Sequence, residues 1–135
     1  MPKVTVLVAV YNAERFLPQC LDSLLAQTMS DFQVICIDDA STDRSLQVLN
    51  TYALRDLRIE VVRLLENRGQ AHARNEGLKQ AEGDIVCMLD ADDWLSADAL
   101  ERLVPQAGQV TRLLAPRRLR KRMLCSPRSR FRPIS

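Results

Sequence analysis

The sequence predicts an α/β fold in which helices cover both faces of a mostly parallel sheet, as an α/β/α sandwich. Four short segments rich in β-branched residues alternate with segments whose apolar residues recur at helical spacing. Apolar character is nearly continuous in the strand segments, which is typical of parallel strands buried on both faces. With 135 residues, the chain has room for at most one domain.

The first unit of the predicted fold is a strand followed by a helix. The β-branched run over residues 4–10 forms the strand, and the turn at Tyr11 and Asn12 ends it. Apolar residues then recur at helical spacing over 16–25, with Asn12 as a candidate N-cap and Glu14 in the first turn.

A second strand, over residues 32–37, ends in two carboxylates, Asp38 and Asp39. Ser41-Thr42-Asp43 offers N-caps to the helix that follows. Asp38, beside these hydroxyls, is itself a candidate cap or turn former. The apolar face of this helix is predicted from four residues, Leu46, Leu49, Tyr52 and Leu54.

The third and fourth strands complete the pattern. Residues 59–64 form a strand, a break at 67–69 follows, and an Ala-rich helix runs from about Gln70 to Gln80. Gly83 then precedes the apolar run 85–89, which reads as a fully buried strand.

Three carboxylates, Asp90, Asp92 and Asp93, follow the last strand directly. Anions so close together repel one another, and a divalent cation would neutralise them. A solvated acidic turn before a helix near Ser96 is the alternative for an isolated motif of this kind. The clusters at Tyr11 and at 38–39 also follow strands, so all three are expected at the carboxyl edge of the sheet, where α/β folds bind ligands.

This set of residues suits a phosphate-bearing ligand with Mn²⁺ or Mg²⁺. One or two carboxylates would hold the cation, which would bridge to diphosphate oxygens. Tyr11 could stack on a base, a contact worth about 1–3 kcal/mol, and Asp39 could accept hydrogen bonds from the base edge. Arg74 could bond a phosphate or brace Asp39, or pair with an acid such as Glu76.

Charge divides the chain into two parts. Residues 1–101 carry all 17 acidic side chains and nine of the 19 basic ones, a net charge of −8, whereas residues 102–135 hold the other ten basic side chains and no acid. The acidic part would repel nucleic acid, so no specific nucleic-acid partner is expected. The basic segment, rich in Arg, Pro and Ser, is predicted to be irregular. It could contact an anionic membrane surface, or it could be a truncated or out-of-frame end.

The cysteines and the N-terminus indicate a compartment. Four widely spaced cysteines form no Cys-x-x-Cys pair, and Cys36 and Cys87 fall inside predicted buried strands, so neither a zinc site nor a disulfide framework is expected. We find no signal peptide, and no run reaches the roughly 20 apolar residues of a membrane span. A cytoplasmic location is expected, with peripheral contact at the inner membrane face as a possibility that the basic segment raises.

Four motifs, in order, resemble those of family 2 glycosyltransferases over about residues 3–100. They are Val8-Ala9-Val10-Tyr11-Asn12-Ala13-Glu14, Asp38-Asp39-Ala40-Ser41-Thr42-Asp43, Asn67-Arg68-Gly69 with Ala73-Arg74-Asn75-Glu76-Gly77, and Leu89-Asp90-Ala91-Asp92-Asp93. The resemblance implies a GT-A fold with a Rossmann-like nucleotide-binding half at residues 1–101. It also implies metal-dependent transfer of a sugar, with inversion, from a nucleotide-diphosphate donor such as a UDP-sugar to the hydroxyl of a glycan or lipid-linked acceptor.

Carried over by position, the resemblance assigns the site. Nucleotide binding is implied for Ala9, Tyr11, Glu14, Asp39, Arg74 and Asp92, with Arg74 close to Asp39, and metal binding for Asp90, Asp92 and Asp93. The family's general base lies in a later, acceptor-binding part, and residues 102–135 contain no Asp or Glu. Since loss of a general base typically costs about 10²–10⁴-fold, an inactive nucleotide-binding remnant is the alternative to an active transferase.

A phosphoacceptor signalling domain would also gather acids at strand ends. That class needs a lysine near the acids, and Lys3 and Lys79, the lysines of residues 1–101, do not follow a predicted strand.

Overall fold

The computed structural model describes residues 2–104 and 122–124. In this part of the chain, five parallel strands form one sheet in the order β3-β2-β1-β4-β5. The strands are β1 (Val4–Val10), β2 (Phe32–Asp38), β3 (Ile59–Arg63), β4 (Ile85–Asp90) and β5 (Arg122–Leu124). The predicted α/β architecture with a parallel sheet is therefore confirmed. Apart from 102–104 and β5, the predicted basic segment lies outside the described residues.

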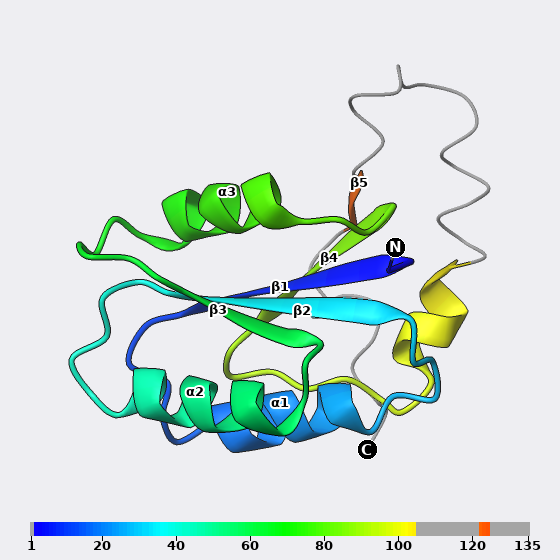
Figure 1. The fold of residues 1–135 in the computed structure, drawn as a ribbon, viewed down its shortest axis with the longest axis horizontal. Helices are drawn as coiled ribbons and strands as arrows, with labels where there is room; N and C mark the ends of the chain where they lie inside the picture. Colours follow the sequence, from blue (N-terminus) through cyan, green and yellow to red (C-terminus); the bar gives the residue numbers. More distant parts are fainter. Residues whose placement is uncertain (1, 105–121, 125–135) are drawn as a thin grey trace.

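Helices cover both faces of the sheet (Figure 1). Helices α1 (Leu17–Leu25) and α2 (Ser45–Arg55) lie on one face, and α3 (Gln70–Gln80) lies on the other. A short helical segment over 99–104 joins the face of α1, where its residues Leu100 and Leu103 enter the same apolar cluster.

Two apolar cores result from the alternation of side chains along the strands. In β1, Val4, Val6, Val8 and Val10 pack toward α1 and α2, whereas Leu7 and Ala9 pack toward α3. Burial on both faces explains why the strands read as continuous apolar runs. The second core is thin, because Gly77 brings α3 close to the sheet: a Cβ there would lie 2.6 Å from Ile37 Cδ1.

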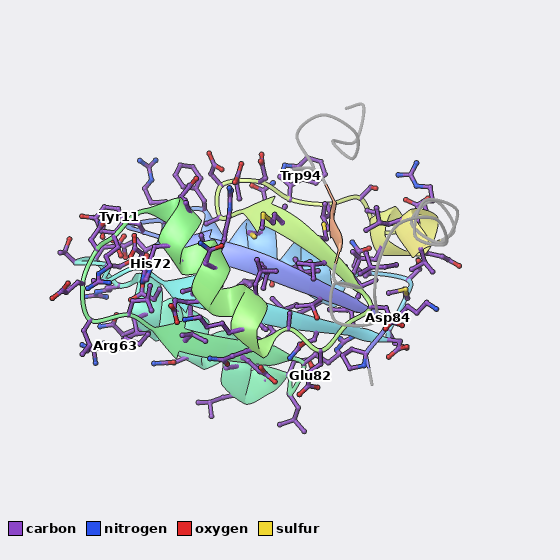
Figure 2. All side chains as sticks on the ribbon, turned by 90° about the horizontal axis from the view of Figure 1, so that it is seen from above. Tyr11, Arg63, His72, Glu82, Asp84 and Trp94 are labelled. Atoms are coloured by element: carbon purple, nitrogen blue, oxygen red, sulfur yellow. The ribbon has the colours of Figure 1, made fainter. Side chains whose placement is uncertain are left out.

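The pairing of the strands places the carboxyl ends of β1, β2 and β4 next to one another, and the polar clusters follow these ends. Val10 pairs with Asp38, and Ala9 pairs with Asp90, so the segments that follow β1, β2 and β4 emerge side by side. Figure 2 shows Tyr11 at this end of the sheet, and Glu82 and Asp84 at the opposite end. The polar clusters that follow these strands therefore lie at the carboxyl edge of the sheet, as expected.

Helix starts and one helix face differ from the predictions. Helix α1 begins at Leu17, so Asn12 is not its N-cap. Helix α2 begins at Ser45, and its N-cap residue Arg44 makes no side-chain cap bond, although Asp43 Oδ1 accepts from the Ser45 amide at 2.8 Å. Leu54 was expected on the apolar face of α2 but is 90% exposed. It follows Tyr52 by two residues, which places it about 200° round the helix from that buried ring.

Cys36 and Cys87 are buried in strands β2 and β4, as predicted. Burial raises the pKa of both thiols to about 12, so these cysteines are apolar core residues and weak nucleophiles. Within the described ranges, no helix has the length and apolar character required to cross a membrane.

Candidate functional site

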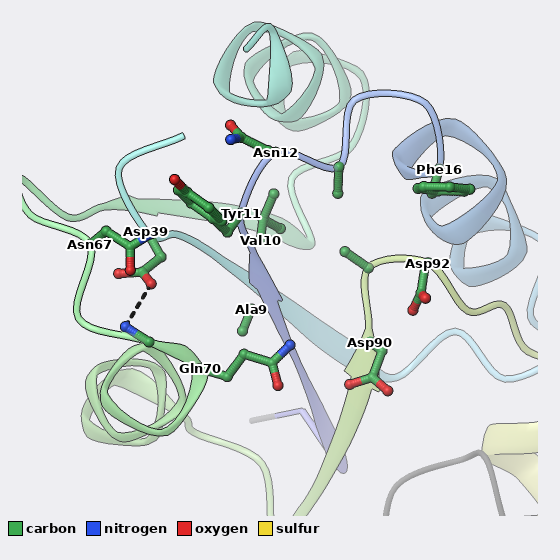
Figure 3. A pocket seen from close by; sticks show the side chains of 13 residues that line it. Ala9, Val10, Tyr11, Asn12, Phe16, Asp39, Asn67, Gln70, Asp90 and Asp92 are labelled. Carbon is green, nitrogen blue, oxygen red and sulfur yellow. Dashed lines mark hydrogen bonds between the residues drawn. The ribbon is translucent and has the colours of Figure 1, made fainter. Parts of the chain in front are cut away.

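A cleft of about 450 Å³ opens at the carboxyl edge of the sheet (Figure 3). Tyr11, Asp39 and Asn67 lie on one side of it, and Asp90 and Asp92 lie on the other. Thirteen residues line it: Ala9, Val10, Tyr11, Asn12, Ala13, Phe16, Asp39, Asn67, Gly69, Gln70, Asp90, Ala91 and Asp92. The cleft therefore joins the aromatic and acidic clusters that the sequence placed at separate strand ends.

The acidic side of the cleft is built by the end of β4 and the turn after it. Asp90, Asp92 and Asp93 each offer a carboxylate oxygen, and these oxygens lie within 4.8 Å of one another. The amide of Asp93 donates to the carbonyl of Asp90 at 2.9 Å, which closes the turn and keeps the three acids together. Hard carboxylate oxygens at this spacing fit Mg²⁺ or Mn²⁺, since a hard cation bound among them would offset their mutual repulsion.

Arg74 reaches the acidic side from α3. Its guanidinium donates to Asp90 Oδ1 at 3.1 Å, with both side chains largely shielded from solvent. Of the roles left open for Arg74, the structure shows pairing with an acid, and that acid is Asp90 and not Glu76 or Asp39. The pair lowers the net charge of the acidic side from −3 to −2, which reduces the repulsion among its carboxylates.

Asp39 is held by the backbone at the start of α3. Its carboxylate is buried and accepts hydrogen bonds from the amides of Arg68, at 3.0 Å, and Gly69, at 2.9 Å. Gly69 has a φ of 94°, a conformation that favours glycine. These bonds fix the carboxylate at the cleft wall, where its remaining lone pairs can accept from a ligand.

Tyr11 and Ala9 both line the cleft. Tyr11 is 49% exposed, so its aromatic side chain is accessible to a planar ligand. Ala9 is buried at the floor, where its small side chain leaves room for the cavity.

Asn12 joins the loop after β1 to the loop after β2. Its own amide donates to Ser41 Oγ at 3.0 Å, and its side-chain oxygen accepts from the amide of Thr42 at 2.8 Å. Asn12 adopts a φ of 49°, which asparagine tolerates better than most residues. Asn12 thus joins the two loops through hydrogen bonds and also lines the cleft.

Glu14 is not among the residues that line the cleft. Its amide donates to Asp43 Oδ2 at 3.3 Å, and the amide of Ala13 donates to Ser45 Oγ at 2.9 Å. Burial raises the pKa of Asp43, but hydrogen bonds from Ser45 and Glu14 outweigh it and bring that pKa below its ordinary value. We call residues 12–14 and 41–45, joined in this way, the loop latch.

Ala40 adopts a φ of 58° between Asp39 and the loop latch. A side chain in this left-handed conformation costs about 1–2 kcal/mol, and the greater freedom of glycine in the unfolded chain offsets part of that. We expect Ala40→Gly to increase the free energy of unfolding by about 1 kcal/mol in urea denaturation. Ala26→Gly, at a φ of −89°, is the control and should not stabilise the chain. A loss of stability in Ala40→Gly would contradict the inference of strain.

Several lining residues were not predicted as site residues. Asn67 and Gln70 flank Gly69, and Phe16 precedes α1. Asn67 belongs to a quoted motif but was given no role, and Phe16 was read only as part of the helical pattern over 16–25. Asp38, a candidate cap, is 1% exposed, and its Oδ1 has no hydrogen-bond partner within the described part of the chain.

The family model described as glycosyl transferase family 2 matches residues 5–127. The chain belongs to this family. Among the curated relatives, the uncharacterized glycosyltransferase EpsJ of Bacillus subtilis is 41% identical over 109 residues. That alignment spans 81% of this chain and 31% of EpsJ.

Solved structures of glycosyltransferases share the fold. S. aureus TarS 1-349 in complex with UDP matches with a TM-score of 0.73 and 34% identity, over 79% of this chain and 32% of that one. The mannosyltransferase PcManGT from Pyrobaculum calidifontis, in complex with GDP-Man and Mn²⁺, matches with a TM-score of 0.66 and 34% identity, over 70% of this chain and 28% of that one. The family 2 chain therefore spans about a third of the length of these relatives.

Proposed function

We propose that this chain is the nucleotide-sugar-binding half of a metal-dependent glycosyltransferase. The observation that carries the proposal is one cleft with an aromatic ring and a fixed carboxylate on one side and Asp90 and Asp92 on the other, with Asp93 clustered beside these two acids. A nucleotide diphosphate has the matching parts, a planar base at one end and a polyanion at the other. The solved relatives with UDP, and with GDP-Man and Mn²⁺, support this ligand class.

The base is assigned to the side formed by Tyr11, Asp39 and Ala9. Tyr11 stacks on the base, and Asp39 accepts a hydrogen bond from an N–H at its edge. Because Asp39 is already oriented by two backbone amides, little ordering is needed on binding. A carboxylate recognises donors only, so this contact discriminates among bases by their edge N–H groups.

The diphosphate is assigned to the acidic side, where Asp90, Asp92 and Asp93 hold Mn²⁺ or Mg²⁺. The cation, when bound, neutralises charge on the departing nucleotide diphosphate. Asp92, which is exposed, faces the ribose and diphosphate. Arg74 keeps Asp90 in place through its 3.1 Å hydrogen bond.

The reaction proposed for the whole protein is transfer of the sugar, with inversion, to a hydroxyl of a glycan or lipid-linked acceptor. Its general base is not assigned to any residue of this chain. A second candidate is nucleotide binding without turnover. Detectable hydrolysis of the sugar donor, or its transfer, separates the two. The ten basic side chains of 102–135 support peripheral contact with an anionic, cytoplasmic membrane face.

Calorimetric titration with UDP, GDP and CDP, each with Mn²⁺ and with EDTA, tests the proposal. We expect one nucleotide, UDP first, to bind in the presence of Mn²⁺ and to lose most of its affinity in EDTA. Absence of binding by a folded chain, verified by circular dichroism, would overturn the proposal. Equal binding with and without metal would remove the role assigned to the acids.

Asp39→Ala tests the base contact. Loss of a hydrogen bond to a charged group costs about 1.5–3 kcal/mol, so we expect the preferred nucleotide to bind about 10–100-fold more weakly. The ratio of affinities with Mn²⁺ and with EDTA should stay as in the wild type, since Asp39 lies across the cleft from the acids. Asp31→Ala, an exposed acid at the other end of β2, is the control. An equal loss for all three nucleotides would argue against a base-edge contact.

A further inference from the structure

A series of hydrogen bonds joins α1 and the loop after it to the segment that follows the three acids. Cys20 Sγ approaches the carbonyl of Asp90 at 3.8 Å, and Ser23 Oγ accepts from the amide of Leu95 at 3.1 Å. The amide of Thr28 donates to the carbonyl of Ala97 at 2.7 Å. These contacts link residues about 70 positions apart in the sequence.

Gln27 is the centre of this series. Its side-chain amide donates to the carbonyl of Ser96 at 2.7 Å, and its side-chain oxygen accepts from the amide of Leu100 at 3.1 Å. The residue is only 9% exposed, so both bonds are shielded from water. A glutamine that donates and accepts in one place fixes the distance between two points of the segment it contacts.

The segment over residues 91–98 has no helix or strand of its own, so its path depends on such contacts. Leu95 and Leu100 are buried in the same apolar cluster as the buried residues of α1, and their packing anchors the segment to the core. Asp92 and Asp93 lie at its start, a few residues before the contacts of Ser23 and Gln27. Because the carboxylates repel one another, an unanchored segment would move them apart.

We propose that Ser23 and Gln27 are positioning residues that hold Asp92 and Asp93 beside Asp90 in the geometry required for a divalent cation. The proposal rests on the metal site assigned under the proposed function. Neither residue lines the cleft, and each acts through the backbone of residues 95–100. Outer groups that orient metal ligands typically contribute about 10–100-fold to metal affinity.

Gln33 provides a matched control within the same fold. It is also buried, at 6% exposure, and its side chain also bonds to distant segments, through Thr5 at 2.8 Å and the amide of Glu82 at 3.1 Å. These contacts lie at the amino end of the sheet, away from the cleft (Figure 2). Gln27→Leu and Gln33→Leu therefore remove similar buried hydrogen bonds. Only the bonds of Gln27 reach the segment that follows Asp92 and Asp93.

The experiment measures Mn²⁺ binding to the whole chain by the loss of the free-Mn²⁺ signal in electron paramagnetic resonance, with Tm recorded for each variant. We expect both variants to lower Tm, and Gln27→Leu alone to weaken Mn²⁺ about 10-fold. Ser23→Ala should weaken Mn²⁺ in the same direction, and Ser23→Thr, which keeps a hydroxyl, should restore it. The serine pair keeps the proposal testable if Gln27→Leu does not fold.

Equal Mn²⁺ affinity in Gln27→Leu and Gln33→Leu, or in Ser23→Ala and the wild type, would overturn the positioning role and leave the metal site standing. A folded wild-type chain that binds no Mn²⁺ would overturn both the metal site and the positioning role.

Discussion

Asp92→Asn combined with Asp93→Asn is expected to abolish the metal-dependent part of nucleotide binding. Both side chains keep their size, but the acidic side loses two of its three charges and two of its candidate ligands. Neutral amides are weaker ligands for a hard cation, so affinity in Mn²⁺ should fall on the order of 100-fold or more. Calorimetry with the preferred nucleotide measures the loss. Affinity in EDTA should change little, because Tyr11 and Asp39 remain.

Asp31→Asn combined with Asp84→Asn is the matched control, since it removes two exposed carboxylates elsewhere. This pair changes net charge by the same amount and should leave Mn²⁺-dependent affinity within about twofold of the wild type, as expected of screened, distant charges. If the two double variants behaved alike, the effect would come from net charge, and the cluster would lose its assignment as a metal site.

Gly83→Ala is expected to cause a much larger loss of stability than Gly77→Ala. An added Cβ would lie 2.6 Å from the amide nitrogen of Thr5 and 2.8 Å from the carbonyl carbon of Val4. These are backbone atoms of β1, the central strand, so relief requires displacement of the strand itself. The same change strains the 2.9 Å bond from the Gly83 amide to Thr5 Oγ1. We expect a loss of about 3 kcal/mol and a Tm lower by about 10 °C or more.

Gly77→Ala is the comparison for this prediction. Its added Cβ would also lie 2.6 Å from another atom, but that atom is the Cδ1 at the end of the Ile37 side chain, which can rotate. Alanine also has a helix propensity about 1 kcal/mol better than that of glycine, so the net change should be small. Thermal unfolding of both variants checks the order. Equal losses of Tm in the two variants would mean that close contact with the backbone of β1 is not the reason for a glycine at position 83.

The strands could be predicted from the sequence because burial on both faces leaves a signal in every residue. The runs at 4–10 and 85–89 contain almost no polar side chains, and the structure places both in the middle of the sheet. The parallel arrangement then brings Tyr11, Asp39 and the three acids to one edge without further information. The buried strands and their parallel arrangement therefore predict the position of most of the cleft.

Partners that depend on side-chain reach could not be predicted. Arg74 was close in sequence to several acids, and only the placement of α3 over the sheet shows that its side chain meets Asp90 at the end of β4. Asn12 and Glu14 belong to recognisable motifs, yet their bonds go to residues about 30 positions later. Gln27 carries no periodic signal at all, because its role depends on a segment about 70 residues away.

The loop latch has a consequence for attempts to change which donor the cleft accepts. Residues 12–14 and 41–45 use their amides and side chains on one another, so substitutions there would disturb the framework before they altered recognition. Asn67 and Gln70 line the same cleft from a segment that the latch does not include. A library restricted to these two positions would vary the surface facing the nucleotide while the two joined loops stayed intact, which makes them the practical starting point for redesign.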